Sequence, residues 1–234
     1  MIVKLADLYF DIDPKYKLLE RMCQGYTCEA TDSDTVHTIR VTDEDIMKET
    51  PDTDYRAPEY LETLAVYRKI SHVLPLHDGY LFHAAVIDVN DSAVAFTARS
   101  GTGKTTHIRL WKKVFGDRVG IINGDKPLIR YKNGVPYAFG TPWSGKENYN
   151  KNVCRPLRAI VIVERGETNL IEKISPKDAA PKFLSQIYLP KNDNELFLTT
   201  LALADKTLKD VPVYRLRCNM EEEAAIVAYN AIFN

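Results

Sequence analysis

Apolar and polar residues alternate in short blocks along this chain, and each block predicts a strand or a helix. Continuous apolar runs, and runs in which every second residue is apolar, are typical of strands. We expect strands at residues 2–5, 8–10, 36–41, 80–89, 94–96, 119–123, 128–131, 135–139, 158–165, 169–174 and 211–216. Apolar residues three and four positions apart are typical of helices. We expect helices at residues 14–22, 57–73, 104–115, 176–188, 194–208 and 220–233.

Short polar segments predict where these elements turn and end. Asn90 and Asp91 are expected to fold residues 80–89 back, antiparallel, onto the next strand, and Asn133-Gly134 predicts a second hairpin. Residues 42–54 are expected to be a polar connection. Pro212 indicates that the last strand lies at a sheet edge, because proline cannot donate to a ladder. The expected helix-capping residues are Asp13, Asp54, Ser175, Asn219 and Glu222.

Length and composition indicate one α/β unit with an appendage. The chain has 234 residues, of which 45% are hydrophobic, enough for a sizeable core. Residues 1–75 carry no recognisable chemical motif, so we interpret them as an N-terminal α+β appendage with a connecting helix. Residues 76–234 would then form the main domain. Four scattered cysteines lack the spacing of a zinc site and are expected to be free thiols.

The charge balance excludes some classes of function. Lys+Arg 31 against Asp+Glu 32 gives a net charge of −1, so no overall field attracts nucleic acid or an anionic membrane. Apolar runs are shorter than the roughly 20 residues of a membrane span, and charged residues interrupt the N-terminal stretch, unlike in a secretory signal. We therefore expect a cytoplasmic protein. Whether it forms a homo-oligomer stays open.

The strongest chemical signal is the segment SAVAFTARSGTGKTT at residues 92–106. It places a glycine-rich loop between an apolar strand and an amphipathic helix, and it fits G-x-x-x-x-G-K-[ST] except that Ala98 replaces the first glycine. Such a loop brings backbone N–H groups close to phosphates at the positive end of a helix. Lys104 would reach the β- and γ-phosphates, and the Thr105 hydroxyl would ligate Mg²⁺. The expected nucleotide-binding residues are Ser100, Gly101, Thr102, Gly103, Lys104, Thr105 and Thr106.

Two other interpretations of this loop are weaker. A dinucleotide-binding loop requires G-x-G-x-x-G, and Thr106 stands where the third glycine should be. A simple glycine turn would carry the lysine, the hydroxyl and the second glycine only by coincidence. We therefore interpret the loop as a phosphate-binding loop.

Further candidate residues lie before and after the loop. Asp125 follows a buried strand at residues 119–123, a position where nucleotide sites commonly place a metal-binding or catalytic carboxylate. His83 lies in the apolar run at residues 80–89, where a structural role is the alternative. The loop at residues 140–148 has little intrinsic tendency to adopt a fixed conformation unless it lines a binding site. Its candidate substrate residues are Trp143, Ser144, Gly145, Lys146 and Glu147; for Trp143, covering an acceptor and anchoring the core are equally supported.

Residues 79–187 resemble the HPr kinase/phosphorylase and phosphoenolpyruvate carboxykinase superfamily, especially the small HPr-kinase-like proteins. Four features carry the resemblance, in chain order: the apolar strand with His83, the SGTGKTT loop, a strand followed by Asn123-Gly124-Asp125, and the GTPW segment at residues 140–143. The resemblance implies an α/β fold with a mixed sheet and flanking helices around a P-loop, plus here a small β-rich N-terminal appendage. It also implies ATP with Mg²⁺ and transfer of a phosphoryl group to a hydroxyl, typically of a serine.

This chain departs from the family pattern at the acidic pair. Asp125 falls on the second acid of that pair, while Gly124 replaces the first, which is the usual base in HPr kinases. His83 or Glu147 would then replace that base, or Asp125 would both bind metal and activate the hydroxyl. The leading hypothesis is an ATP-dependent kinase acting on a small molecule, peptide or protein, with Asp125, His83 and Lys104 as catalytic residues. The alternatives are a nucleotide-binding regulator with weak or no catalysis and a purely structural interaction domain.

Overall fold

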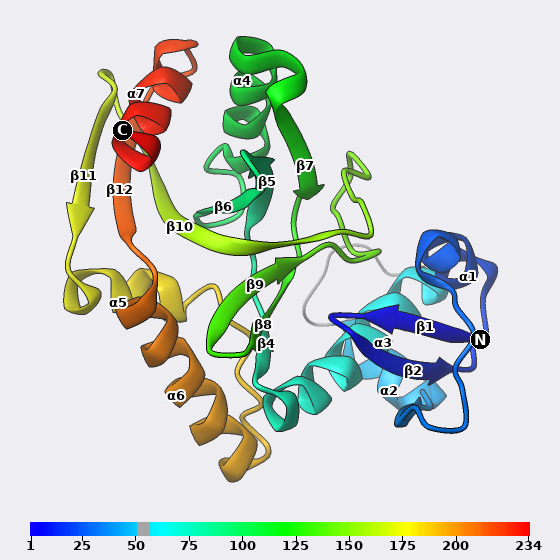
Figure 1. The fold of residues 1–234 in the computed structure, drawn as a ribbon. Coiled ribbons are helices and arrows are strands. Elements are labelled where there is room, and N and C mark those ends of the chain that lie inside the picture. Colours follow the sequence, from blue (N-terminus) through cyan, green and yellow to red (C-terminus); the bar gives the residue numbers. More distant parts are fainter. Residues whose placement is uncertain (51–56) are drawn as a thin grey trace.

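A mixed β-sheet with helices on both faces forms the larger part of the molecule, in the computed structural model, which describes residues 1–50 and 57–234 (Figure 1). The expected α/β class, with a mixed sheet and flanking helices, is confirmed. Over these residues the larger sheet has nine strands. They are β4 (Gly79–Leu81), β5 (Ala85–Val89), β6 (Ser92–Thr97), β7 (Val119–Asn123), β8 (Leu128–Lys132), β9 (Val135–Phe139), β10 (Cys154–Arg165), β11 (Leu170–Ile174) and β12 (Val213–Cys218).

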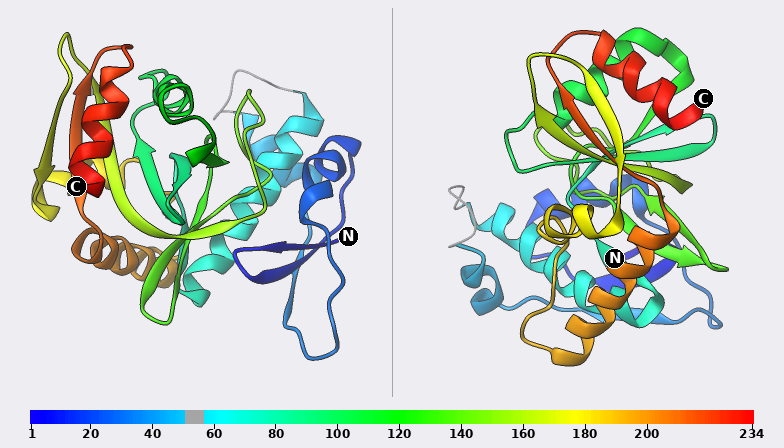
Figure 2. Two further views of the ribbon diagram at one scale, coloured as in Figure 1. Left: turned by 45° about the horizontal axis from the view of Figure 1, so that its top comes forward. Right: turned by 90° about the vertical axis from the view of Figure 1, so that its left-hand side faces the viewer.

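The long strand β10 joins the two halves of this sheet. Its first residues, Cys154 to Pro156, pair antiparallel with β9, which continues through β8 to β4. From Leu157 it pairs in parallel with β6 on one side, and from Ile160 it also pairs in parallel with β12 on the other. Beyond β6 the order is β5 and then β7, both antiparallel, and β11 flanks β12. Figure 2 shows that β10 bends strongly between the part that pairs with β9 and the part that pairs with β6 and β12, so the whole sheet is curled.

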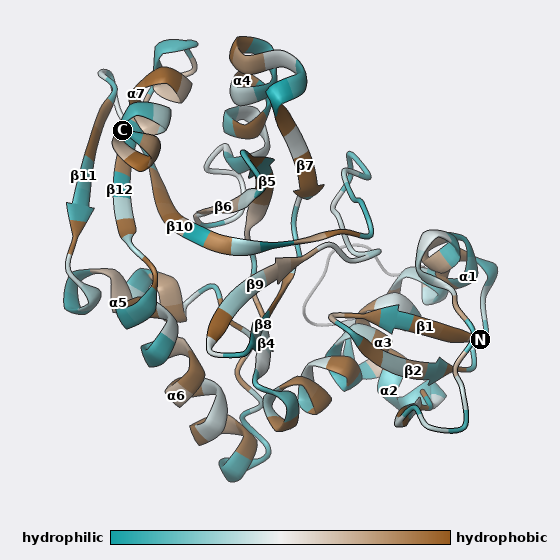
Figure 3. Cartoon of the chain, viewed as in Figure 1, coloured by the Kyte–Doolittle hydropathy of each residue, from teal (hydrophilic) through white to brown (hydrophobic). Residues whose placement is uncertain are grey.

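Two pairs of helices cover the sheet, because its central strands are apolar on both faces. Ala93 and Ala95 of β6 pack with α5 (Pro176–Leu184) and α6 (Asn194–Asp210), whereas Val94 and Phe96 pack with α4 (Lys104–Phe115) and α7 (Glu223–Phe233). Figure 3 shows the resulting pattern, with hydrophobic residues along the central strands and hydrophilic residues on the outer turns of the helices. No helix in residues 1–50 or 57–234 is long and apolar enough to cross a bilayer.

Over residues 1–50 and 57–73, the N-terminal part forms a smaller three-stranded sheet with three α-helices. The strands β1 (Ile2–Leu5), β2 (Leu8–Ile12) and β3 (Val36–Ile39) lie in that order, with α1 (Lys17–Cys23), α2 (Asp43–Lys48) and α3 (Pro58–Val73) beside them. Its hydrophobic cluster continues into the main sheet, where Leu81, Leu128, Phe139 and Trp143 belong to the same cluster. The proposed domain boundary after residue 75 stays a prediction.

The two expected hairpins are confirmed. β5 and β6 pair antiparallel through Asn90 and Asp91, with φ of 51° and 56°. β8 and β9 pair through Asn133 and Gly134, with φ of 51° and 80°. Two consecutive residues with positive φ form the turn that suits the right-handed twist of paired strands, which is why Asn, Asp and Gly occur there. The Ser175 cap is also confirmed, since its Oγ accepts a hydrogen bond from the Asp178 N–H.

The expected single strand at residues 80–89 is wrong. The structure divides it into β4, which pairs with β8, and β5, which pairs with β6 and β7. Phe82, His83 and Ala84 lie between the two strands, where the chain passes from one half of the sheet to the other. His83 is therefore at a strand junction, and its position depends on the curl of the sheet.

Other expected element ends are corrected. Residues 42–54 contain α2, whose N-cap Thr42 forms a capping box with Asp45, in place of a plain connection. The cap of α1 is Tyr16 and not Asp13. Residue Asp54 lies outside the described residues.

Near the C-terminus, three more expectations differ from the structure. α5 ends at Leu184, before the expected residue 188. β12 lies between β10 and β11, so Pro212 precedes an internal strand and does not mark an edge. α7 begins at Glu223, and its N-cap Glu222 makes no capping hydrogen bond through its side chain.

Candidate functional site

The glycine-rich loop connects β6 to α4 as the sequence predicts. Gly101 and Gly103 have φ of 77° and 122°, in the left-handed region that favours glycine. An added Cβ at either position would meet no atom within 4 Å, so backbone conformation and not crowding requires these glycines. The loop therefore presents main chain toward open space at the N-terminus of α4, the end of a helix that favours anions.

Arg165, the last residue of β10, holds the outer side of this loop. Its Nη2 donates to the Gly101 carbonyl at 2.7 Å, and its Nε donates to the Thr102 carbonyl at 3.4 Å. The Thr102 N–H donates back to the Arg99 carbonyl at 3.2 Å. Because two loop carbonyls are directed at Arg165, the loop conformation is fixed from the neighbouring strand.

Lys104 begins α4 and is almost fully buried, with 7% of its surface exposed. Its Nζ donates to the Ala98 carbonyl at 3.0 Å. Burial lowers the pKa of this ammonium group below its usual value and Lys126 lowers it further, whereas the charge of Asp125 acts to raise it. The Asp125 carboxylate is thus within electrostatic reach of Lys104.

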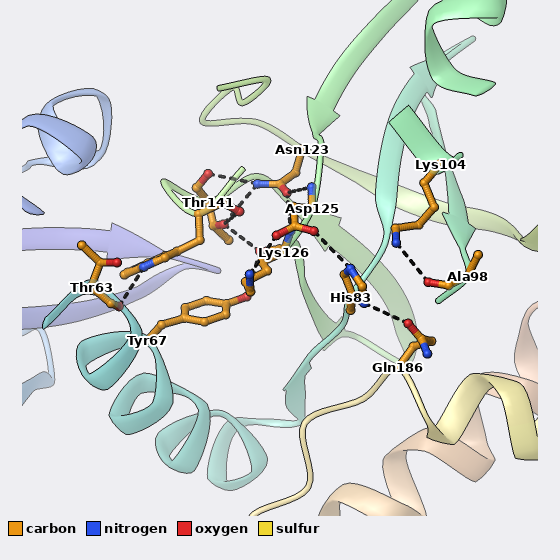
Figure 4. Close-up of polar contacts among 11 residues, drawn as sticks. Thr63, Tyr67, His83, Ala98, Lys104, Asn123, Asp125, Lys126, Thr141 and Gln186 are labelled. Atoms are coloured by element: carbon orange, nitrogen blue, oxygen red, sulfur yellow. Dashed lines mark hydrogen bonds and ion pairs between the residues drawn. The ribbon is translucent and has the colours of Figure 1, made fainter. Parts of the chain in front are cut away.

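Asp125 lies two residues beyond the end of β7 and faces the side chains of His83 and Lys126. Its Oδ1 is 3.1 Å from His83 Nε2, and its Oδ2 accepts from Lys126 Nζ at 2.8 Å (Figure 4). Burial acts to raise the pKa of this carboxyl. The hydrogen bond from His83 and the charge of Lys126 outweigh burial and hold the pKa well below its usual range. Asp125 is therefore a carboxylate at neutral pH.

His83 is held on both sides of its ring. Its Nδ1 is 2.8 Å from Gln186 Oε1, opposite the contact of Nε2 with Asp125 (Figure 4). The main chain is fixed as well, since Thr97 Oγ1 donates to the His83 carbonyl at 2.9 Å and the His83 N–H donates to the Gln186 carbonyl at 2.8 Å. The strand junction thus places an oriented imidazole between the loop strand and Asp125.

Asn123 and Thr141 fix the turn that carries Asp125. Asn123 Oδ1 accepts from the N–H groups of Asp125 and Lys126 at 2.9 and 2.7 Å. Its Nδ2 donates to the Thr141 carbonyl and Oγ1, at 3.0 and 3.1 Å. The Lys126 carbonyl accepts from Thr141 Oγ1 at 2.7 Å and from the Tyr67 hydroxyl at 2.8 Å. Asn123 and Thr141 are fully buried, so these bonds replace water and set the direction of Asp125.

The loop at residues 140–148 packs directly against this turn. A Cβ on Gly140 would lie 1.8 Å from the Lys151 carbonyl oxygen, so only glycine fits at the start of the loop. A Cβ on Gly145 would lie 3.2 Å from the Cβ of Asp125. The loop therefore covers one side of Asp125 at close range.

Trp143 anchors this loop in the core. Its ring stacks on Tyr67 with centroids 4.5 Å apart, and its Nε1–H donates to the Thr63 carbonyl of α3 at 2.9 Å. Only 4% of its surface is exposed. Of the two accounts that the sequence left equal, the contacts of Trp143 support the core anchor.

The remaining residues of this loop differ in exposure. Ser144 is buried, and its Oγ accepts from Asn150 Nδ2 at 2.9 Å. Lys146 and Glu147 are exposed, and Glu147 lies 3.4 Å from Arg109 of α4. Because Glu147 contacts the helix that follows the glycine loop, the two loops lie beside each other.

The structure brings part of the predicted set together. Lys104, His83, Asp125 and Gly145 form one cluster, in which each member contacts another or lies within its electrostatic reach. Ser100 and Thr106 are exposed at the mouth of the loop, and Thr102 and Thr105 are half-buried there. Trp143 lies apart from the cluster in the core.

Besides Lys126 and Tyr67, three residues that hold the site were missed from the sequence. Asn123 carried a usable signal, because an asparagine before Gly-Asp at a strand end commonly bonds to backbone N–H groups two and three residues on. Thr141 and Gln186 carried none, since their partners are 18 and 103 residues away in the chain.

No protein-family model matches this chain, and no curated protein matches its sequence. Among solved structures, the fold is similar to that of the Hpr(Ser) kinase/phosphatase from Coxiella burnetii. The identity is 8% and the TM-score 0.37, over 64% of this chain and 95% of that chain. At this TM-score the likeness carries no information about chemistry. Any inference about function must therefore come from the side chains of the site.

Proposed function

We propose that this protein binds ATP with Mg²⁺ at the glycine-rich loop and transfers the γ-phosphoryl group to a hydroxyl acceptor. The observation that supports this most directly is a buried lysine at the first position of a helix, behind an open glycine loop and within electrostatic reach of an ionised aspartate. A buried cation needs an anion to compensate it. Phosphate oxygens would supply that compensation.

The phosphate-binding role belongs to residues 100–106 in this proposal. The loop N–H groups and the N-terminus of α4 would hold phosphate oxygens, and Lys104 would act as a fixed point charge beside them. Lys104 is already oriented by the Ala98 carbonyl, so binding need not order its side chain. The methyl group of Ala98, which replaces the usual first glycine, leaves this contact intact because the acceptor is main chain.

The residues present fit a magnesium ion that is bound mainly through phosphate. No cluster of three or more His, Cys, Asp or Glu side chains occurs in the described ranges. Mg²⁺ in nucleotide sites usually takes one or two protein ligands together with phosphate and water. Thr105 and Asp125 would be those ligands, and the ion would neutralise phosphate charge when bound. Asp125 Oδ2 already accepts from Lys126, so Lys126 would have to share this carboxylate or release it.

The surroundings of Asp125 and His83 favour charge stabilisation over strong general-base catalysis. Asp125 is a weak base because its pKa is held low by His83 and Lys126 against the effect of burial. His83 is an oriented donor toward Asp125 and lies near the phosphate loop. In phosphoryl transfer most of the rate comes from positioning and charge neutralisation, which this pair can supply without a strong base. Glu147 is exposed and is the alternative base on the acceptor side.

The acceptor would approach along the loop at residues 144–147. Gly145 packs on Asp125, while Lys146 and Glu147 are exposed beside it, so a hydroxyl group could enter from this side. Ser144 supports the loop from within through Asn150. The acceptor is a small molecule, a peptide or a protein in this proposal.

A second function, nucleotide binding without efficient transfer, is favoured by one observation. Gly124 occupies the position of the first family acid, and a Cβ there would lie 2.8 Å from the Ser144 carbonyl oxygen. The fold therefore has no room for that acid in its present form. A regulator that binds ATP and changes conformation would need Lys104 and the loop but not a strong base.

Thermal unfolding with Mg-ATP tests the nucleotide site first. At a hundredfold excess over Kd, binding stabilises a protein by about 2.7 kcal/mol, which raises Tm by roughly 5–10 °C for a chain of this size. We expect this rise in the natural protein and its loss in Lys104→Ala. Lys113→Ala is the matched control, because Lys113 is on the same helix and is exposed. A full rise in Lys104→Ala would contradict the proposal.

Labelled ATP then separates the two functions. With γ-labelled Mg-ATP and a cell extract, a kinase produces a labelled acceptor whose formation falls by several powers of ten in Lys104→Ala. A protein that gains stability from Mg-ATP but labels no acceptor supports the regulator.

A further inference from the structure

We propose that Gln186 is a positioning residue that holds the His83 ring so that Nε2 faces Asp125 and the phosphate loop. The inference rests on the proposed function, because the ring it orients would act on the transferred group. Gln186 lies in the segment after α5, which the sequence assigned to a helix end. Its side chain is the partner of His83 on the side opposite Asp125.

The orientation of the Gln186 amide follows from its other contact. Gln186 Nε2 donates to Ser185 Oγ at 3.0 Å, and Ser185 Oγ donates its only hydrogen to the Lys182 carbonyl at 2.7 Å. Ser185 Oγ can therefore only accept from Gln186. This places the Gln186 carbonyl oxygen, an acceptor, against His83 Nδ1 at 2.8 Å. Nδ1 must then carry a hydrogen. Asp125 Oδ1 can only accept, so Nε2, at 3.1 Å, donates to it, and each ring nitrogen donates to one acceptor.

Main-chain pairing keeps the two side chains in register. The His83 N–H donates to the Gln186 carbonyl, Phe82 and Ile187 form an antiparallel bridge, and the Tyr188 N–H donates to the Leu81 carbonyl. The segment at residues 186–188 is thus a short cross-strand partner of the junction that carries His83. Because these bonds use backbone atoms, they persist when the Gln186 side chain is changed. A side-chain substitution therefore isolates the contact with the ring.

Without the Gln186 acceptor, the ring of His83 would be fixed on one side only. The imidazole can turn about its side-chain bonds so that either nitrogen faces Asp125. A misplacement of about 1 Å can cost on the order of a hundredfold in rate, so we expect turnover to fall about tenfold to a hundredfold. Affinity for Mg-ATP should be unchanged, because within the described residues the hydrogen bonds of Gln186 go to His83, Ser185 and Phe183 and not to residues 98–106.

Two substitutions in the full chain separate orientation from structure. Gln186→Met keeps the length of the side chain but removes the acceptor, and Gln186→Glu keeps an oxygen acceptor at the same position. The rate readout is hydrolysis of Mg-ATP with water as acceptor, measured with the thermal midpoint and the Mg-ATP affinity. The spectroscopic readout is the His83 Nδ1–H signal in histidine-labelled protein, assigned by its loss in His83→Gln.

We expect Gln186→Met to lower kcat about tenfold to a hundredfold with unchanged KM for ATP and to lose the protected Nδ1–H signal. Gln186→Glu should keep the signal and most of the turnover. The inference is overturned if Gln186→Met keeps both the signal and the rate. It is also overturned if both variants fall together with the thermal midpoint, which would indicate a structural role. Failure of the natural protein to bind Mg-ATP would instead remove the proposed function, and the Nδ1–H comparison would still decide the role of Gln186.

Discussion

At the residue scale, the main chain around Gly124 decides which acids the site can hold. The Gly124 N–H donates to the Tyr149 carbonyl at 2.8 Å, so the turn is tied to the segment that follows the 140–148 loop. A Cβ at position 124 would lie 2.8 Å from the Ser144 carbonyl oxygen and 3.3 Å from the Cβ of Tyr149. The loop that covers Asp125 therefore occupies the space that a first acid would need. The close packing of the 140–148 loop on this turn therefore explains why residue 124 is glycine and not an acid.

We predict that Gly124→Asp destabilises the protein and does not create an active acidic pair. Forcing a side chain into a packed site typically costs about 1–3 kcal/mol, and here the opposing atom is backbone. Urea unfolding of Gly124→Asp measures this cost. Gly25→Asp is the matched control, because a Cβ on Gly25 meets nothing within 4 Å. If Gly124→Asp were as stable as the control and gained phosphoryl transfer, our account of the missing acid would be wrong.

The sequence predicted those site residues whose chemistry is local. Lys104 and the loop glycines follow from one motif, and Asp125 follows from its place after a buried strand. Tyr67, Thr141 and Gln186 could not be predicted, because each acts through a hydrogen bond to a residue 15 or more positions away. Such pairs arise only when the sheet curls and brings separate segments together. Polar residues of these types are otherwise common on loops and surfaces, so their identity alone carries no signal.

At the element scale, the hydrophobic pattern predicted strands well and their junctions poorly. Residues 80–89 are buried almost throughout, so nothing in the apolar run marks the change from β4 to β5. The break depends on which strands pair, and pairing is a property of the whole sheet. The Thr42-Asp45 capping box was legible in the sequence, but the short α2 behind it has too few residues for a helical period. β12 follows a proline and lies inside the sheet, because the proline precedes the paired residues.

Helix α4 carries an imidazole that cannot ionise easily in the folded protein. His107 is buried, and its Nε2 accepts from Trp111 Nε1 at 3.0 Å; Nδ1 has no partner within residues 1–50 and 57–234. Since tryptophan Nε1 only donates, His107 is neutral in this contact. Burial lowers the pKa of His107 from 6.5 to about 3.

We predict that His107 makes the protein less stable at acid pH. Its folded pKa is depressed, so the unfolded state binds the proton more readily, and stability is lost as pH falls below about 6.5 toward about 3. For this group alone the loss is about 2 kcal/mol between pH 7 and pH 5. Urea unfolding of the natural protein and of His107→Gln across this pH range isolates the contribution of His107 to stability. Glutamine can still accept from Trp111 but does not titrate. Equal pH slopes in the two proteins would contradict the assignment.

At the scale of the whole molecule, the N-terminal part braces the site from two sides. Through α3, the Tyr67 hydroxyl donates to the Lys126 carbonyl, and the Thr63 carbonyl accepts from Trp143. On the other side, Tyr188 lies in the segment that carries Gln186, and its hydroxyl is 3.2 Å from Nε2 of His72 in α3. One helix thus contacts both the turn of Asp125 and the segment that orients His83. The part of the chain with no chemical motif therefore contributes the frame of the site.

We predict that residues 76–234 alone do not fold into a cooperative unit. Removing residues 1–75 would expose Leu81, Leu128, Phe139 and Trp143, which share one buried cluster with the N-terminal part. Burying such side chains contributes about 1.5–3 kcal/mol each, so the loss of four would be comparable to the whole stability of a domain, about 5–15 kcal/mol. Thermal unfolding and near-ultraviolet circular dichroism of the shortened chain, with the full chain as reference, measure this. A sharp transition near that of the full chain, together with stabilisation by Mg-ATP, would show instead that residue 75 ends an independent domain. The contacts that the N-terminal part makes with the site would then not be needed for phosphate binding.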